Sequence, residues 1–268
     1  MSMMRHFALL ILLTVSPATT WAQGGPPLIT DDPDTPGPRH WEINFASVIE
    51  SSTLHRQIEA PLVDLNYGVG RRIQLKLEMP WMRVREGNEA FETGAGDAFA
   101  GVKWRFLGQE GTRVAWSVYP QFAFNTSQSS IVRGIVDRGH EVLLPTELTV
   151  EFAHVEINGE AGRNFVEHRP DDWILGASTE GTVSRRLELL AEFHAEQTPG
   201  ETSERFVNIG ARPRLTRRIM VLLAAGRTVT SHSAESRVYI YTGLQLNLPD
   251  QFSFKDVDLT AVNPRARR

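Results

Sequence analysis

The chain has 268 residues, a formal net charge of −4 and no cysteine. Because no basic stripe is present, a nucleic-acid-binding surface is not expected. Without cysteine, the fold must be stable without disulfide bonds.

The first 22 residues predict export from the cytoplasm. A short start with Arg5 and His6 is followed by the apolar run 7–15 and by Thr20-Trp21-Ala22, an ending that suits signal peptidase. This order is typical of a secretory signal peptide, and we predict cleavage after Ala22. The apolar run is much shorter than the roughly 20 residues that span a bilayer, so an uncleaved anchor is the weaker interpretation.

The next segment, residues 23–39, is rich in proline, glycine and aspartate. This composition predicts no regular element, and we interpret the segment as a flexible periplasmic leader. Residues 31–37 are similar to a calcium-binding loop, but Pro36 occupies a ligand position and Ile43 stands where a bidentate glutamate is required. No metal site is therefore predicted here.

From His40 onward, apolar and polar residues alternate along the chain. In one stretch, Leu75 and Leu77 alternate with Lys76 and Glu78. A period of two residues is typical of a strand with one apolar and one polar face. We predict twelve strands, at residues 40–51, 57–67, 72–84, 97–107, 113–124, 141–150, 155–164, 172–180, 186–196, 204–215, 219–229 and 237–248.

These strands predict an all-β fold, an antiparallel up-and-down transmembrane β-barrel over residues 40–248 with about 12 strands (range about 10–14). Their lengths match the roughly 9–11 residues with which a tilted strand crosses a bilayer. Short turns alternate with longer loops, as in outer-membrane barrels, and only the first loop, 52–56, departs from this rule. The apolar face then contacts lipid, and a soluble barrel with that face inside is the fold-level alternative. Residues 249–268 are predicted to form a polar C-terminal tail.

A series of motifs supports the same fold. In chain order they are Thr30-Asp31-Asp32-Pro33, His40-Trp41-Glu42-Ile43-Asn44, Asp64-Leu65-Asn66-Tyr67-Gly68, Gln74 to Pro80, Gly94-Ala95-Gly96-Asp97 and Gly101 to Phe106. Over residues 28–248 the chain resembles the outer-membrane family labelled for the MetA-pathway of phenol degradation. The resemblance implies a barrel with a role in the uptake of small, often aromatic or apolar, compounds. The last strand of outer-membrane barrels commonly ends in an aromatic residue, whereas this chain continues into a polar tail that ends in Arg267-Arg268. This departure puts the terminal insertion signal in question, and not the barrel.

If the apolar face meets lipid, the polar face lines a lumen. Both charge signs occur there, which argues against strong ion selectivity. The long loop 125–140 is interpreted as an outer lid or constriction, with a mobile surface loop as the equal alternative. The predicted lumen-lining residues are Asp64, Asn66, Gln74, Lys76, Glu78, Lys103, Arg105, Gln121, Glu147, Glu156, Glu188, Glu192, Arg212, Arg214, Tyr239 and Tyr241.

A search for catalytic patterns identifies one histidine of interest. His194 lies between Glu192 and Glu196 on the polar face of a predicted strand. A solvated lumen network is the favoured interpretation over a metal or serine–histidine–acid site. Acidic residues of this strand stand opposite Arg212 and Arg214 and predict cross-strand ion pairs. No catalytic residue, metal or other cofactor is predicted.

Three functions remain open at this point. The leading hypothesis is passive passage of a small molecule, often aromatic or apolar, across the outer membrane of a Gram-negative bacterium. The alternatives are a non-transporting envelope barrel with a plugged lumen and an outer-membrane lipid hydrolase. The expected partners are outer-membrane lipid, the barrel-assembly machinery and a small-molecule solute, with no nucleic acid.

Overall fold

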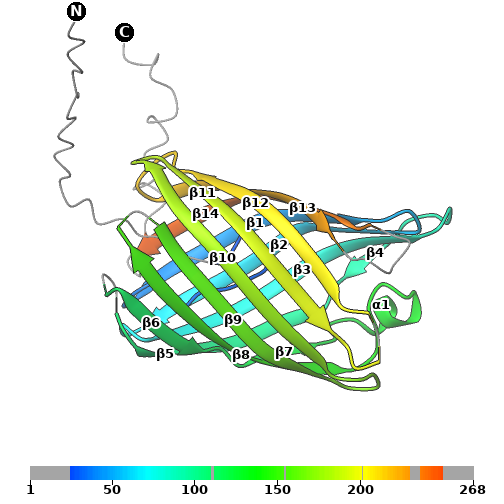
Figure 1. Ribbon diagram of the computed structural model, residues 1–268. Helices are drawn as coiled ribbons and strands as arrows, with labels where there is room; N and C mark the ends of the chain where they lie inside the picture. The colour runs from blue at the N-terminus through cyan, green and yellow to red at the C-terminus, as the bar shows by residue number, and fades with distance from the viewer. Residues whose placement is uncertain (1–24, 110–111, 154, 201, 230–235, 250–268) are drawn as a thin grey trace, which may run out of the picture.

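The computed structural model describes residues 25–109, 112–153, 155–200, 202–229 and 236–249. They form a closed antiparallel barrel (Figure 1). Closure comes from the first and last strands, which pair along their whole length from His40 with Pro249 to Ser51 with Val238. The predicted signal peptide, residues 23–24 of the predicted leader and residues 250–268 of the predicted tail lie outside the described residues.

The barrel contains twelve strands, two of which are interrupted. Strand β3 pairs with both β4 and β5, and β8 pairs with both β6 and β7, so each of these short pairs forms one strand of the wall. The predicted all-β barrel is confirmed. The strands are β1 (His40–Ser51), β2 (His55–Val69), β3 (Ile73–Glu86), β4 (Glu92–Ala95), β5 (Ala98–Leu107), β6 (Val114–Val118), β7 (Gln121–Phe124), β8 (His140–Phe152), β9 (Val155–Val166), β10 (Asp172–Ser184), β11 (Leu187–Gln197), β12 (Glu204–Pro213), β13 (Ile219–Thr228) and β14 (Val238–Pro249).

The two ends of the barrel differ. One end, here called the turn end, holds both termini of the barrel and the short connections such as 70–72 and 185–186. The other, the loop end, holds the longer connections and one short one, 52–54. The single helix of the described residues, α1 (Gln128–Val132), lies in one of the longer connections. Among the described residues, no helix has both the length and the apolar character needed to cross a membrane.

The outer surface of the barrel is apolar. On β3, the side chains of Leu75, Leu77, Met79 and Trp81 point outward and are 37–47% exposed. Aromatic rings gather near both edges of this surface: Trp41 packs on Tyr67 at the turn end, with ring centroids 4.7 Å apart, and Trp81 and Trp173 lie nearer the loop end. A continuous apolar band with aromatic residues at its margins is typical of a lipid-facing barrel wall.

The inner face is mostly polar, but it also has an apolar part. Leu190 and Leu222 point inward and pack with Tyr239 and Tyr241 in one buried cluster. Strict alternation of apolar and polar residues did not predict this cluster. On β11 the inward Leu190 lies between the inward Glu188 and Glu192, and on β13 the inward Met220, Leu222 and Ala224 are all apolar. The lumen therefore has a polar and an apolar side.

Candidate functional site

Residues 25–39, here called the luminal segment, run from inside the barrel to its turn-end rim (Figure 1). Pro38 and Arg39 are exposed at this rim, and the preceding residues are buried or half-buried within the barrel. Thr30 and Asp32 are only 1% and 2% exposed. The sequence predicted a flexible leader for these residues. In the structure these residues are not a free leader, because the wall of the barrel supplies partners for their polar groups.

Two cations of β5 hold the acidic part of the luminal segment. Lys103 Nζ donates to Asp31 Oδ1 at 2.9 Å and to the backbone carbonyl of Asp32. Arg105 Nη1 donates to Asp34 Oδ1 at 2.6 Å, and its Nη2 donates to the carbonyl of Arg71 at 2.8 Å. Lys103 is 1% exposed and Arg105 is 4% exposed. A charge buried this deeply is tolerated only when it is paired and hydrogen-bonded, so these contacts fix the segment to the wall.

Carboxylates on the opposite side of the lumen accept backbone N–H groups of the segment. Glu192 accepts from the N–H groups of Ile29 and Thr30, and Glu160 Oε2 accepts from Asp31 N at 3.2 Å. Glycine at position 176 permits this approach, since a Cβ there would lie 2.3 Å from Thr30 Oγ1. The segment is thus held between β5 on one side and β9 to β11 on the other.

The first part of the luminal segment packs on the apolar side of the lumen. Leu28 is 6% exposed and belongs to the same buried cluster as Leu190 and Leu222. Tyr239 Oη donates to the carbonyl of Pro27 at 3.4 Å. Apolar burial and polar contacts therefore act together on one short segment.

The structure places all sixteen predicted lumen-lining residues on the inner face, buried or half-buried. Several are joined in networks. Lys76 Nζ lies 2.8 Å from Glu78 and 3.7 Å from Asp64. Lys103 Nζ also lies 3.5 Å from Glu147.

A second network crosses β10 to β12. Arg212 contacts Glu180 with two hydrogen bonds, at 2.7 and 3.2 Å, and Glu188 at 3.9 Å. Arg214 lies 3.2 Å from Glu188. Of the predicted cross-strand pairs, the structure contains those of Glu188. Glu192 instead holds the luminal segment and accepts from Asn208, and Glu196 lies beside His194.

Sequence reasoning did not name several inward polar residues. The rule of alternation would have found them, because each lies two positions along its strand from another inward-facing residue. They are Glu42, Asn44, Asn158, Glu160, Glu180, Asn208 and Gln245.

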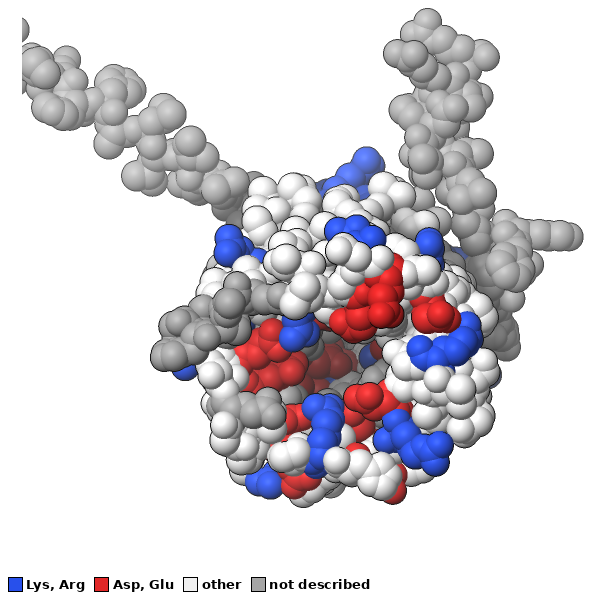
Figure 2. Space-filling model, turned by 90° about the vertical axis from the view of Figure 1, so that its right-hand side faces the viewer, with Lys and Arg blue, Asp and Glu red and all other residues white. Residues whose placement is uncertain are grey.

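A cavity of about 440 Å³ opens toward the loop end. Figure 2 views this end and shows a hollow whose walls carry many acidic residues. The luminal segment contributes Ile29 and Asp31 to the lining of this cavity, here called the outer cavity. The remaining lining residues are Lys76, Glu78, Phe99, Gln121, Ala123, Glu141, Leu143, Glu160, Asn164, Arg169, Asp172, Ile174, His194 and Glu196.

The loop of residues 125–139 is anchored at the rim of the barrel. Thr126 Oγ1 donates to the carbonyl of Gly96 at 2.7 Å, and Ile135 packs against the inward side chain of Met82. Asn125 Nδ2 donates to Asp97 Oδ1 at 2.8 Å and to the backbone carbonyl of Asp137 at 2.8 Å. These contacts favour the outer-lid interpretation over that of a free surface loop.

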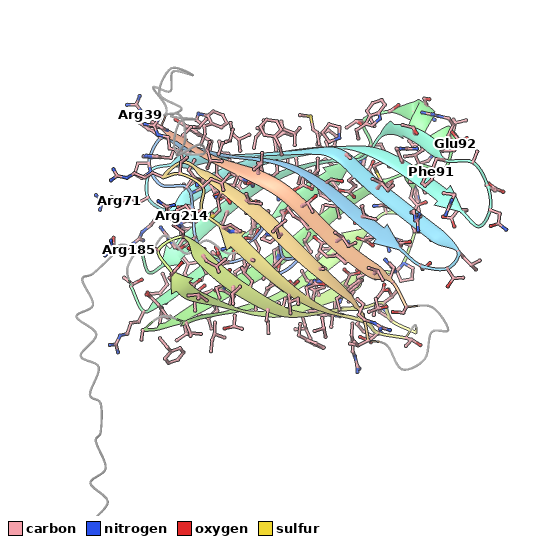
Figure 3. All side chains as sticks on the ribbon, turned by 90° about the horizontal axis from the view of Figure 1, so that it is seen from above. Arg39, Arg71, Phe91, Glu92, Arg185 and Arg214 are labelled. Atoms are coloured by element: carbon pink, nitrogen blue, oxygen red, sulfur yellow. The ribbon has the colours of Figure 1, made fainter. Side chains whose placement is uncertain are left out.

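Arginines lie at both rims of the barrel, with Arg133 and Arg169 among those at the loop end. Arg39, Arg71, Arg185 and Arg214 lie at the turn end, whereas Phe91 and Glu92 lie at the loop end (Figure 3). Most of the turn-end arginines are exposed. A cationic rim is suited to contact with lipid phosphates at the edge of an apolar band.

The chain has structural neighbours but no sequence relatives that meet the threshold of comparison. No protein-family model and no curated protein sequence matches it. An outer-membrane channel from Pseudomonas putida is similar in fold, with a TM-score of 0.60 and 10% identity over 78% of this chain and 94% of the channel. The NanC porin has a TM-score of 0.57 and 6% identity over 77% of this chain and 100% of the porin. The translocator domain of the autotransporter NalP from Neisseria meningitidis has a TM-score of 0.54 and 10% identity over 78% and 89% of the two chains. At these identities the neighbours establish the barrel fold, which they share.

Proposed function

We propose that this protein is an outer-membrane channel for a small molecule and that the luminal segment controls passage. The observation that carries the proposal is the outer cavity, which opens at the loop end and is bounded inside the barrel by Ile29 and Asp31 of the segment. A solute that enters from the loop end meets the segment before it can reach the turn end. The sixteen residues predicted to line the lumen form the wall of this route.

Several independent features support the membrane location. The outer wall is apolar with aromatic margins, and the inner wall is polar, as a lipid-embedded barrel requires. The likeness in fold to an outer-membrane channel and to a porin agrees with the proposal. The proposed partners are outer-membrane lipid, the assembly machinery and the solute itself.

The class of solute follows from the two-sided lumen. Leu190, Leu222 and the tyrosine pair are covered by Leu28 of the luminal segment, and withdrawal of the segment would expose them as an apolar surface beside the polar networks. A small molecule with an apolar or aromatic body can use such a surface, which agrees with the uptake role implied by the resemblance to the phenol-degradation family.

A plugged barrel that transports nothing is the second candidate. The buried ion pair of Lys103 with Asp31 favours it, because withdrawal of the segment would separate the two charges and leave Lys103 without this partner. The two candidates differ in whether the segment moves.

A reversible tether tests this point. In a Thr30→Cys/Gly176→Cys variant, the added Cβ at position 176 lies about 3.0 Å from Cβ of residue 30, slightly inside the 3.5–4.5 Å found in disulfides. Because the chain has no other cysteine, only this bond can form. We expect single-channel currents in planar bilayers to be low when the pair is oxidised and to rise several-fold on reduction.

The control variant is Thr30→Cys/Gly181→Cys, since nothing among the described residues lies within 4 Å of a Cβ at position 181. It should respond to neither oxidant nor reductant. If the tether variant conducts in neither the oxidised nor the reduced state, the result contradicts the channel and favours the plugged barrel.

A further inference from the structure

The outer cavity has an excess of acidic side chains. Six carboxylates line it, against two permanent cations, Lys76 and Arg169. Lys76 pairs with Glu78, and Arg169 lies within 3.4 Å of both Glu141 and Asp172. Asp31 pairs with Lys103 outside the lining. Two carboxylates, Glu160 and Glu196, form no ion pair with lysine or arginine among the described residues.

A buried histidine lies between these two carboxylates. His194 is 2% exposed, and its Nε2 lies 3.5 Å from Glu196 Oε1, which places a proton on Nε2. Its Nδ1 has no hydrogen-bond partner in the part of the chain that the structure describes. In the neutral imidazole, that nitrogen is an acceptor, and a buried acceptor without a donor is rare.

The register of the strands brings the acceptors to one place. Gly176 of β10 pairs with Glu160 on one side and with His194 on the other. Thr30 of the luminal segment fills the space left by the missing side chain of Gly176, so Glu160 and His194 stand on either side of this threonine. An N–H donor with a positive charge satisfies the carboxylates and the imidazole together.

Beside its charged residues and the amides of Gln121 and Asn164, the outer cavity has an apolar part. Ile29, Phe99, Leu143 and Ile174 form this part of the lining. A hydrated metal ion gains nothing from such walls, whereas an apolar body does, and the ring of Phe99 also attracts a cation. The volume of about 440 Å³ lies in the range of small-molecule sites.

We propose that the outer cavity binds a small organic cation, an ammonium group on an apolar or aromatic body. Glu160, Glu196 and Nδ1 of His194 receive the ammonium N–H groups, and the apolar walls cover the body. This inference rests on the proposed function, because it names the class of solute that enters the route from the loop end.

Calorimetric titration of the folded chain in detergent tests the proposal. The probes are 2-phenylethylammonium, its neutral counterpart 2-phenylethanol and the anion 3-phenylpropionate, at about pH 9, well above the ordinary pKa of an imidazole. We expect the cation to bind at least ten-fold more tightly than the alcohol, and the anion not to bind. Equal affinity for cation and alcohol would overturn the proposal.

Variants locate the site. Glu160→Gln/Glu196→Gln should weaken binding of the cation at least ten-fold and leave binding of the alcohol unchanged. Glu196→Gln alone, at a side chain that is 48% exposed, serves where the double variant does not fold, and should weaken binding several-fold. The matched control is Glu86→Gln, a carboxylate at the loop end whose side chain is 63% exposed and which lies outside the lining. An equal loss in Glu86→Gln would overturn the assignment.

Recording on the same preparations separates the two proposals. Selective binding of the cation without conductance in any state of the tether would contradict the proposed function and leave the site intact. Conductance released by reduction, with no preference for the cation, would support the channel and overturn this inference alone.

Discussion

Neighbouring residues on one strand have opposite surroundings. Leu77 points outward and is 37% exposed, about midway between Trp81 and the turn-end limit of β3, whereas Lys76 points into the lumen and pairs with Glu78. We expect Leu77→Arg to lower the free energy of unfolding by about 2–4 kcal/mol, the cost of arginine near the bilayer midplane. Denaturant unfolding in lipid vesicles, followed by tryptophan fluorescence, measures it.

Two comparisons make this prediction specific. Leu75→Arg lies nearer the turn end and should cost less, because the penalty falls toward the membrane surface. Lys76→Ala should leave assembly intact and change permeation. The reverse order, with Lys76→Ala blocking assembly and Leu77→Arg tolerated, would mean that the wall is inside out.

At the residue scale, alternation predicted the face of a side chain well and its partner poorly. It placed Glu188 and Glu192 on the same inner face and predicted arginine partners for both. Glu188 does meet arginine, whereas Glu192 accepts from the backbone of Thr30. Alternation also failed at Leu190, which lies between them and is 4% exposed inside the barrel. Partners depend on register across several strands, which a single strand does not encode.

At the scale of elements, interruptions and irregular segments were hardest to predict. The strand predicted at 113–124 divides into β6 and β7 around Tyr119 and Pro120, because proline has no N–H for the ladder. The luminal segment lacks any periodic pattern, as its composition indicated. Its order comes from Lys103, Arg105 and Glu192, which are far away in sequence, so composition alone could not predict it.

Lys103 joins the luminal segment to the wall. It lies between Asp31 and Glu147, and Glu147 is fully buried. We expect Lys103→Met to lower the free energy of unfolding by about 3–5 kcal/mol, because both carboxylates lose their buried cation. Adding Glu147→Gln should recover part of the loss by removing one of these charges. Denaturant unfolding of the single and double variants measures both effects, and a single-variant loss below about 1 kcal/mol would contradict the role given to Lys103.

At the scale of the whole molecule, the rhythm of short turns and longer loops predicted the closed barrel and the side on which the termini lie. Each strand must cross the same apolar thickness before the chain can reverse, so the connections recur at regular intervals along the sequence. This rhythm implies an orientation, with the turn end and its arginine rim toward the periplasm and the loop end outward.

Single cysteines test this orientation, because the chain has none of its own. Glu92→Cys places a thiol at the loop end, and Arg185→Cys places the matched control at the turn end (Figure 3). Both positions are exposed. A bulky maleimide that cannot cross the outer membrane should label Glu92→Cys in intact cells and Arg185→Cys only after lysis. Labelling in the opposite pattern would invert the orientation.

Fractionation of the unlabelled chain tests the membrane location itself. We expect recovery in the membrane fraction, because an apolar band like that on β3 is not left exposed to water. Recovery in the soluble fraction, without the faster gel mobility that unheated membrane barrels show, would contradict the membrane location.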